Sequence, residues 1–271
     1  MSSDAQAEEA GPSPRPLGGR HALITGGNRG IGAAIAEELA GLGANLTLAA
    51  RDQAALRQQR DRLAATGAVA VHGQAVDLGD AASIEAAVAA AREALGPIEI
   101  LVNNAGIAPS APLAKADLPT WERAFGVNVT APFLLCQAVL DDMQGAGFGR
   151  IVNVASTAGV RGYPFVSAYV ASKHALVGLT RSLALELAKG PITVNAVCPG
   201  YTETEMAANA IANIAQSGKT EAEARAILTR GNPQGRLVQP DEVARAVGWL
   251  CLPGSAAVTG QAIAVAGGEV M

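Results

Sequence analysis

The chain contains few cysteines, few aromatic residues and no strong excess of charge of either sign. Three of its 271 residues are Cys, 3% are aromatic, and the formal net charge is −4. Because Cys136, Cys198 and Cys251 are far apart and set in apolar sequence, they predict buried thiols rather than disulfides or a metal framework. A net charge of this size provides no broad basic surface, so we expect no nucleic-acid partner.

Long apolar segments and metal-binding patterns are lacking as well. The chain has no run of about 18 uncharged apolar residues, so we expect no membrane span. His21, His72 and His174 have no spacing that suggests a metal site. Residues 1–19 are acidic and then rich in Pro and Gly, without the apolar stretch of a signal peptide. We therefore expect a disordered leader over 1–19 and a cytoplasmic protein.

Short apolar runs alternate with longer segments that carry apolar residues at helical spacing. Strands are expected at 21–25, 45–50, 69–76, 98–103, 150–156, 192–197 and 262–266. Helices are expected at 31–42, 52–66, 80–95, 117–144, 167–189, 240–251 and, less regularly, 202–230. This alternation predicts an α/β fold: a single doubly wound Rossmann domain over 20–271, with a seven-stranded parallel sheet and helices on both faces. Ligands of such sheets bind beyond the carboxyl ends of the strands.

The first expected strand runs directly into TGGNRGIG, residues 25–32. Glycines at this position let the backbone turn sharply and approach a pyrophosphate, whose charge the amino end of the next helix stabilises. Because the motif lies between an expected strand and an expected helix, it favours a dinucleotide site over a glycine-rich turn that only packs.

The end of the second expected strand indicates which dinucleotide is bound. A carboxylate there would hydrogen-bond to the 2′-hydroxyl of NAD and repel a 2′-phosphate, but this chain has Ala49, Ala50 and Arg51. Arg51, together with Arg29 in the glycine loop, could bind the 2′-phosphate through bidentate contacts. We expect NADP (NADPH) as the cofactor, with NAD as the alternative because Asp52 adjoins Arg51. The competing interpretation is that both arginines are solvated surface charges.

The segment SAYVASK, residues 167–173, places Tyr169 and Lys173 four residues apart in an expected helix. Positions i and i+4 lie on one face of a helix, and an ammonium beside a phenol favours the phenolate. We therefore expect Lys173 to lower the pKa of Tyr169 from its ordinary value of about 10, which would make Tyr169 a proton donor or acceptor. Taken alone, a Tyr–Lys pair at this spacing is more often structural.

Seven motifs in order resemble those of the short-chain dehydrogenase/reductase family, and the likeness runs from about residue 20 to the C-terminus. They are TGGNRGIG, Asp77 and Leu78 after the third strand, NNAG at 103–106, Asn128, Ser156, Tyr169 with Lys173, and Pro199 with Gly200. CPGYTETEM at 198–206 and GRLVQPDEVA at 235–244 are more closely similar to 3-oxoacyl-thioester reductases, including the ketoreductases of bacterial aromatic polyketide synthesis.

The resemblance implies a catalytic tetrad of Asn128, Ser156, Tyr169 and Lys173. In such a tetrad Tyr169 protonates a carbonyl oxygen while NADPH delivers hydride to the carbon, and Tyr169 is the base in the reverse direction. Ser156 donates to or orients the same oxygen, Lys173 also binds the nicotinamide ribose, and Asn128 holds a water that links Lys173 to solvent. From the residues alone, Ser156 could simply cap a strand end and Asn128 could satisfy buried backbone groups.

The resemblance also implies which residues bind the cofactor. They are expected to be Gly26, Asn28, Arg29, Gly30, Ile31, Gly32, Arg51, Asp77, Leu78, Asn104, Ala105, Gly106, Tyr169, Lys173, Pro199, Gly200, Thr202 and Thr204. For Asp77 the alternative is the ordinary role of such an aspartate, a turn or helix cap.

Substrate contacts are expected from aromatic residues near the cleft and from a lid over about 201–232. The residues assigned to the substrate are Ser156, Tyr163, Phe165, Tyr201 and Met206.

Within the lid, Met206, Ala210 and Ile214 recur at a spacing of four, which fits either a cover over an apolar substrate or ordinary packing of that helix. Gly218 is a candidate hinge. The cations that could meet the phosphates of a carrier thioester are Lys219, Arg225 and Arg230.

These observations predict an NADP-dependent oxidoreductase without a metal. The best substrate class is a 3-oxoacyl thioester on coenzyme A or a carrier protein, reduced to the 3-hydroxyacyl form. An NAD-dependent secondary-alcohol or sugar dehydrogenase would use the same residues, whereas a dinucleotide-sensing regulator has no need of Tyr169 and Lys173 together. Family likeness also implies a homotetramer built on the helices 117–144 and 167–189.

Overall fold

Seven parallel strands form one sheet in the computed structural model, which describes residues 15–216 and 218–271. The strands are β1 (His21–Thr25), β2 (Asn45–Ala50), β3 (Val71–Ala75), β4 (Ile100–Asn103), β5 (Gly149–Val154), β6 (Ile192–Pro199) and β7 (Ala262–Val265). Their order is β3-β2-β1-β4-β5-β6-β7, and every neighbouring pair is parallel. The order reverses between β1 and β4, so a crevice is expected beyond the carboxyl ends of these two strands. The predicted sheet is confirmed.

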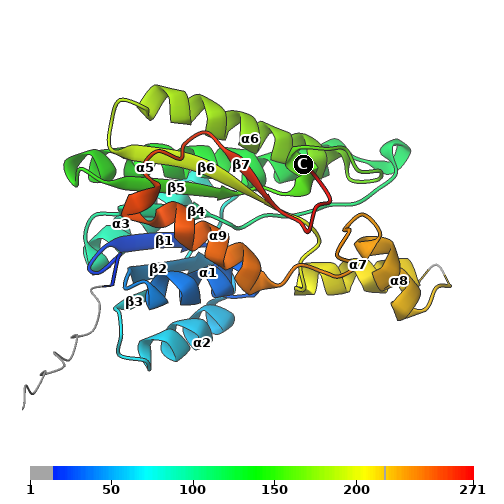
Figure 1. Ribbon diagram of the computed structural model, residues 1–271, viewed down its shortest axis with the longest axis horizontal. Helices are drawn as coiled ribbons and strands as arrows, with labels where there is room; N and C mark the ends of the chain where they lie inside the picture. The colour runs from blue at the N-terminus through cyan, green and yellow to red at the C-terminus, as the bar shows by residue number, and fades with distance from the viewer. Residues whose placement is uncertain (1–14, 217) are drawn as a thin grey trace, which may run out of the picture.

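Helices cover both faces of the sheet (Figure 1). They are α1 (Gly30–Gly41), α2 (Gln53–Ala64), α3 (Ala81–Leu95), α4 (Leu118–Phe125), α5 (Ala131–Gly145), α6 (Ser167–Leu187), α7 (Glu205–Ala215), α8 (Glu221–Thr229) and α9 (Pro240–Cys251). The irregular stretch 202–230 contains two helices, α7 and α8, which stand out beyond the end of β6 (Figure 1). The helix predicted at 117–144 is α4 and α5 joined by a π-helical turn, Gly126–Thr130.

Two apolar cores fix this arrangement. On one face, α1, α2 and α9 pack through fully buried side chains such as Ile35, Leu39 and Val247. On the other face, α3, α5 and α6 pack through side chains such as Ile84 and Val139. Burial of each large aliphatic side chain contributes about 1.5–3 kcal/mol, so both helical layers are held firmly against the strands whose ends form the crevice.

The first described residues belong to the stretch that was predicted as a leader. Residues 1–14 lie outside the described residues, but 16–19 form turns and Leu17 is fully buried in the core of the α1 face. The Leu17 backbone N–H also donates to the Leu42 carbonyl at 2.9 Å. Leu17 therefore anchors the segment before β1, and the extent of the leader stays a prediction.

The continuous helical stretch Leu118–Gly145 is long and apolar enough, by length and composition alone, to cross a membrane. From the sequence, no membrane span was expected here. Leu135, Val139 and Met143 of the stretch are buried in the core under α5, so packing against the sheet accounts for much of its apolar character. Such a helix is weak evidence of membrane insertion, since core helices of soluble proteins have the same composition.

Close approach of α1 to the glycine loop depends on Gly32. A Cβ built at Gly32 would lie 2.0 Å from the Gly26 carbonyl oxygen and 2.5 Å from Asn104 Nδ2. The first contact is to backbone and cannot be relieved by a rotamer change. At the other end of the same helix, a Cβ on Gly41 would meet no heavy atom within 4 Å.

We predict opposite effects for alanine at these two helical glycines. Gly32→Ala should lower the free energy of unfolding by about 1–3 kcal/mol, because overpacking must displace backbone. Gly41→Ala should raise it by up to about 1 kcal/mol, since alanine loses less conformational entropy in a helix. Urea unfolding of both variants measures the difference, and equal changes in stability would contradict the packing argument.

Candidate active site

The amino end of α1 lies open at the carboxyl end of β1. Gly26 and Gly30 have positive φ values of 66° and 53°, which shape the turn between strand and helix. The N-cap residue Arg29 makes no side-chain cap, and the first turn of α1 has no acidic residue, whereas α2 and α3 are capped by Asp52 and Asp80. Uncapped N–H groups at the positive end of a helix dipole bind anions. The residues present therefore fit a bound pyrophosphate.

The segment after β4 is tied to the end of β1. The backbone N–H groups of Asn104 and Ala105 donate to Thr25 Oγ1 at 3.0 and 3.1 Å, and Asn104 Nδ2 donates to the Thr25 carbonyl at 2.9 Å. These bonds hold both sides of the crevice together. Asn28 lies half-buried in the glycine loop, and Ile31 packs partly against the core under α1.

The two arginines proposed for a 2′-phosphate differ in their surroundings. Arg29 Nη1 forms an ion pair with Glu205 Oε2 of α7 at 2.6 Å, with 65% and 71% of the two side chains exposed. Arg51 follows β2 and is exposed, and within residues 15–216 and 218–271 we find no hydrogen bond or ion pair of its guanidinium. Arg51 can therefore meet an anion directly, while Arg29 would have to exchange Glu205 for it. Exposed ion pairs contribute about 0–1 kcal/mol, so the exchange costs little.

Asp77 folds onto its own turn after β3. Its Oδ1 accepts from the Gly79 N–H at 3.0 Å, and its own N–H donates to Ser83 Oγ at 2.9 Å. Leu78 packs partly against the core under α3. The turn role left open by the sequence is therefore present, and a contact of either residue with a cofactor stays a prediction.

Tyr169, Lys173 and Ser156 meet where α6 passes the end of β5. Lys173 is only 4% exposed, and its Nζ donates to the Val154 carbonyl at 2.8 Å and lies 5.8 Å from the centroid of the Tyr169 ring. Ser156, two residues beyond Val154, caps the short 3-10 helix Thr157–Gly159. Ser156 also lies close enough to the Tyr169 phenol to lower its pKa, against the effect of burial. The structure brings three of the four tetrad residues together.

The electrostatics of this group differ from the sequence-based expectation. Burial raises the pKa of Tyr169 above its ordinary value, and the hydrogen bond with Ser156 only partly opposes this. Burial lowers the pKa of Lys173 to about 8. The expectation that Lys173 lowers the pKa of Tyr169 was therefore wrong for this structure, because desolvation dominates and the ammonium is directed at the Val154 carbonyl. A raised pKa keeps the phenol protonated at neutral pH, as a general acid requires.

Asn128, the fourth residue, lies fully buried in the π-helical turn between α4 and α5. Its Oδ1 accepts from the Ile107 N–H, and its Nδ2 donates to the Ile107 carbonyl and to Ser172 Oγ of α6, each at 2.9 Å. A Cβ on Gly106 would lie 3.2 Å from Asn128 Oδ1 and 3.4 Å from Lys173 Nζ. Asn128 thus satisfies buried backbone beside Lys173, and its role in holding a water stays a prediction.

The segment after β6 connects the crevice to the lid. β6 ends at Pro199, Thr202 Oγ1 donates to the Gly200 carbonyl at 3.0 Å, and Thr204 Oγ1 donates to the Thr202 carbonyl at 3.2 Å. A Cβ on Gly30 would lie 3.3 Å from Thr204 Cγ2. The start of the lid therefore lies against the glycine loop, as cofactor contacts from Thr202 and Thr204 would require.

Aromatic and apolar side chains gather on the substrate side. The rings of Tyr163 and Tyr201 lie edge to face, with centroids 6.4 Å apart. Phe165 is 63% exposed and has a positive φ of 66°, a strained conformation that costs a non-glycine residue about 1–3 kcal/mol. Met206 lies in the first turn of α7 and is 51% exposed. Their contacts with a substrate stay predictions.

The lid has a small core of its own. The buried residues of this core are Ala207, Ile211, Ala224, Leu228 and Leu237. Ala210 and Ile214 pack partly against this core, whereas Met206 does not. Of the three apolar residues at a spacing of four, two therefore serve packing and one remains at the surface. Arg225 pairs with Glu203 through two contacts of 2.6 and 2.8 Å.

Two carboxylates near the site, those of Glu205 and Glu269, were not singled out from the sequence. Glu205 pairs with Arg29, while Glu269 and Thr157 both hydrogen-bond to the Tyr163 hydroxyl, at 2.5 and 2.7 Å. The one available signal was the isolated carboxylate of Glu269 directly after two glycines at the end of the last strand.

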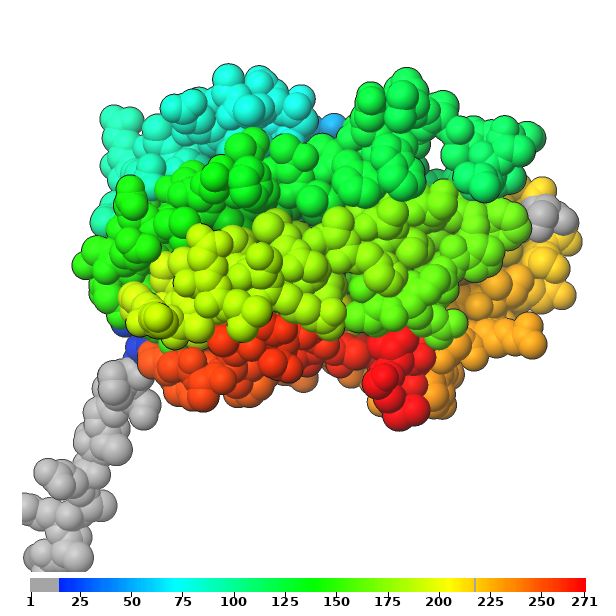
Figure 2. Space-filling view, turned by 90° about the horizontal axis from the view of Figure 1, so that it is seen from above, coloured from blue at the N-terminus to red at the C-terminus, as the bar shows by residue number. Residues whose placement is uncertain are grey.

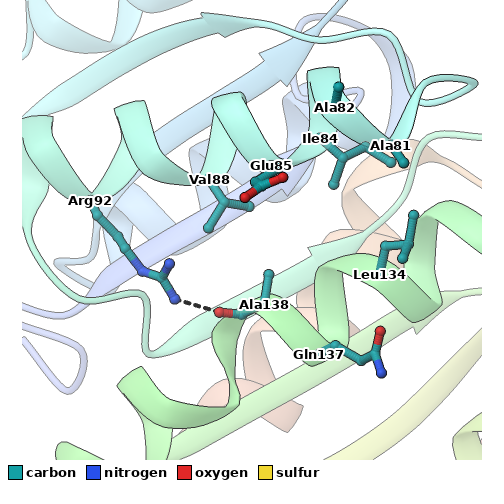
Figure 3. A pocket seen from close by; sticks show the side chains of 9 residues that line it. All are labelled: Ala81, Ala82, Ile84, Glu85, Val88, Arg92, Leu134, Gln137 and Ala138. Atoms are coloured by element: carbon teal, nitrogen blue, oxygen red, sulfur yellow. Dashed lines mark hydrogen bonds between the residues drawn. The ribbon is translucent and has the colours of Figure 1, made fainter.

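A separate hollow lies between α3 and α5 (Figure 3). It is lined mainly by apolar side chains such as Ile84, Val88 and Leu134, and Arg92 reaches across it to the Ala138 carbonyl. It contains none of the predicted site residues, so the chemistry is assigned to the crevice.

Comparison with known proteins gives a consistent result. The chain is 44% identical over 252 residues to a protein named as ketoacyl reductase 1 of the granaticin polyketide synthase of Streptomyces violaceoruber, covering 91% of this chain and 92% of that protein. It is 38% identical over 255 residues to the 3-oxoacyl-(acyl-carrier-protein) reductase FabG of Vibrio cholerae, covering 94% and 99% of the two chains.

A solved structure is similar over the whole fold. The crystal structure of an actinorhodin polyketide ketoreductase variant with NADPH matches this chain with a TM-score of 0.88 and 42% sequence identity, covering 92% of this chain and 97% of that one. A sequence model of the short chain dehydrogenases matches residues 20–215. The chain, with its glycine loop, its seven parallel strands and its Tyr169–Lys173 pair, belongs to the short-chain dehydrogenase/reductase family.

Proposed function

We propose that this protein reduces a 3-oxoacyl thioester to the 3-hydroxyacyl form with NADPH. The observation that carries the proposal is the convergence of Tyr169, Ser156 and Lys173 beside a crevice whose α1 amino end is uncapped. Relatives named as ketoacyl reductases and as a 3-oxoacyl-(acyl-carrier-protein) reductase, and a similar structure with NADPH, support the substrate class and the cofactor.

NADPH, when bound, supplies the hydride that reduces the carbonyl carbon. Tyr169 donates the proton to the carbonyl oxygen, and its raised pKa keeps that proton in place at neutral pH. Ser156 donates a second hydrogen bond to the same oxygen. Lys173, with a pKa of about 8, is mostly an ammonium at neutral pH and, held on the Val154 carbonyl, would bind the hydroxyls of the nicotinamide ribose.

The residues that would hold NADPH come from four segments. The α1 amino end and the glycine loop receive the pyrophosphate, Asn104–Gly106 and Pro199–Thr204 line the two sides of the crevice, and Arg51 binds the 2′-phosphate. Asp77 and Leu78 would contact the adenine side of the cofactor.

Tyr169→Phe should abolish catalysis while the cofactor still binds. Loss of a general acid lowers kcat by about 10²–10⁴-fold, and removing one hydroxyl should leave the dissociation constant of NADPH within about twofold, since the ring still packs. Steady-state assays with 3-oxoacyl thioesters, cyclic ketones and sugars, together with a fluorescence titration of NADPH, measure both quantities. An unchanged kcat, or a loss of NADPH binding that matches the loss of rate, would refute the assignment.

Arg51→Ala should weaken the binding of NADPH about tenfold or more and leave the binding of NADH almost unchanged. The reason is that a charge-assisted hydrogen bond to phosphate contributes about 1.5–3 kcal/mol. Arg57→Ala, which removes another exposed charge from the neighbouring α2, is the matched control and should affect neither cofactor. Isothermal titration with the two reduced nicotinamides measures the ratio of affinities. Equal weakening of both would exclude a phosphate contact.

One observation favours a second candidate, an NAD-dependent secondary-alcohol or sugar dehydrogenase with the same catalytic residues. The Glu205 carboxylate forms an ion pair with Arg29 beside the glycine loop, and its negative charge would repel a phosphate bound nearby. The same titration separates the candidates, because NAD dependence predicts tighter binding of NADH than of NADPH. A dinucleotide-sensing regulator is disfavoured because it has no need of Tyr169 and Lys173 together.

The substrate side fits an acyl chain better than a small polar ligand. Phe165, Tyr201 and Met206 expose apolar surface, and Lys219 and Arg230 remain exposed on the lid for phosphates of coenzyme A or a carrier protein. Arg225 would first have to leave Glu203.

We also infer a cytoplasmic homotetramer without membrane or nucleic-acid partners. The three cysteines are free and buried, as expected in a reducing compartment. The face of α4, α5 and α6 (Figure 2) exposes large apolar side chains that a partner would cover, among them Leu118, Trp121, Phe133 and Leu185. Light scattering should give four times the 27.3 kDa chain mass; a monomeric mass would exclude this assembly.

A further inference from the structure

The chain turns back on itself after β7 and buries a carboxylate. Gly267 and Gly268 have positive φ values of 60° and 91°, and the Glu269 N–H donates to the Ala266 carbonyl at 3.1 Å, the pattern of a type I′ turn. A Cβ on Gly267 would lie 2.2 Å from Asn232 Oδ1, so the turn requires glycine there. The turn directs the Glu269 side chain inward, where only 5% of it is exposed.

The carboxylate lies where three segments of the substrate side meet. A Cβ on Gly200, after β6, would be 3.0 Å from Glu269 Oε2, and one on Gly231, at the end of the lid, would be 3.1 Å from Oε1. The Tyr163 hydroxyl, from the loop before α6, donates to Oε1 at 2.5 Å. Burying a carboxylate is costly unless its oxygens are paired or hydrogen-bonded, so the hydrogen bond from Tyr163 favours the buried position of Glu269.

A chain of hydrogen bonds leads from this carboxylate to the catalytic serine. Tyr163 has one hydroxyl proton, which goes to Glu269, so its oxygen accepts from the Thr157 hydroxyl at 2.7 Å. Thr157 directly follows Ser156, and its carbonyl accepts the N–H groups of Val160 and Arg161, each at 3.0 Å. This series of hydrogen bonds therefore ends at Thr157, on the turn that carries Ser156.

The groups around Tyr163 keep its hydroxyl protonated, so that Tyr163 remains the donor to Glu269. Burial and the hydrogen bond with Glu269 raise the pKa of Tyr163, so its hydroxyl stays protonated and remains the donor. The Arg161 guanidinium lies 3.8 Å from Glu269 Oε1, donates to the Glu269 carbonyl at 3.3 Å and sits over the Tyr163 ring. Burial and the nearby Glu269 charge also raise the pKa of Tyr201.

We propose that Glu269 is a positioning residue for the reduction: acting through Tyr163 and Thr157, its carboxylate fixes the turn that holds Ser156 against Tyr169. Its effect on rate rests on the proposed reductase function, whereas its effect on the turn does not. Glu269 itself touches neither the reacting carbonyl nor the proton donor in this scheme.

Kinetics of four variants test the proposal. E269L should lower kcat for the best ketone by about tenfold to a hundredfold, the loss expected when a reacting group is misplaced, with NADPH affinity unchanged. E269Q should stay within about threefold of the unmodified protein, because the amide oxygen still accepts from Tyr163. Y163F should lower kcat by the same factor as E269L. The double variant should lower kcat no further than either single variant. E37Q, which removes an exposed carboxylate of α1, is the control.

Hydrogen exchange read by mass spectrometry tests the turn without any substrate. The amides of 157–161 should exchange about tenfold faster in E269L, as expected for a loosened local unit, and at the original rate in E269Q. Unchanged exchange in E269L, or equal kcat losses in E269L and E269Q, would overturn the proposal. If the unmodified protein reduces no ketone, the proposed function fails, and the exchange rates still decide whether Glu269 holds the turn.

Discussion

The site depends on one buried hydrogen bond, from the Lys173 ammonium to the Val154 carbonyl at the end of β5. Together with the apolar packing of α6, this bond brings Tyr169, one turn earlier, near Ser156, two residues beyond Val154. Burying an ammonium is unfavourable, which is why the pKa of Lys173 is lowered to about 8. The fold supplies the necessary stability through its two apolar cores, and glycine at 106 leaves room for the lysine side chain.

Segments distant in sequence complete the crevice around this bond. Thr204 of the lid lies against Gly30, and Glu205 pairs with Arg29, so the lid contacts the glycine loop at two points. On the substrate side, the carboxylate of Glu269 meets the ends of the lid and of β6. A few polar contacts therefore connect the segment after β6 with the glycine loop and with the end of the chain. If our proposals hold, these contacts would link binding of the dinucleotide to the positioning of Ser156.

Short-range sequence patterns predicted the fold, and they also predicted several residues that the structure places at the carboxyl ends of the strands. Alternating strands and helices gave the sheet, and motifs at strand ends gave the glycine loop, Ser156 and the Tyr169–Lys173 pair, because parallel strands bring their carboxyl ends to one edge. The family likeness identified Asn128, although nothing in the sequence showed that it lies in a π-helical turn.

Features set by tertiary contacts escaped sequence analysis. The direction of the Tyr169 pKa shift was wrong because spacing on a helix says nothing about desolvation, which decides the sign here. Leu17 among prolines, the Arg29–Glu205 pair across 176 residues and the burial of Glu269 all depend on partners far along the chain.

The most direct test of this account is the pKa of Lys173 measured by NMR on protein with 13C-labelled lysine, with the Cε resonance assigned by comparison with Lys173→Arg. The account predicts one lysine that titrates at about pH 8. If every lysine titrates near the ordinary value of 10.5, the ammonium is solvated rather than buried at the end of β5, and the arrangement of Tyr169 and Ser156 around it would have to be abandoned.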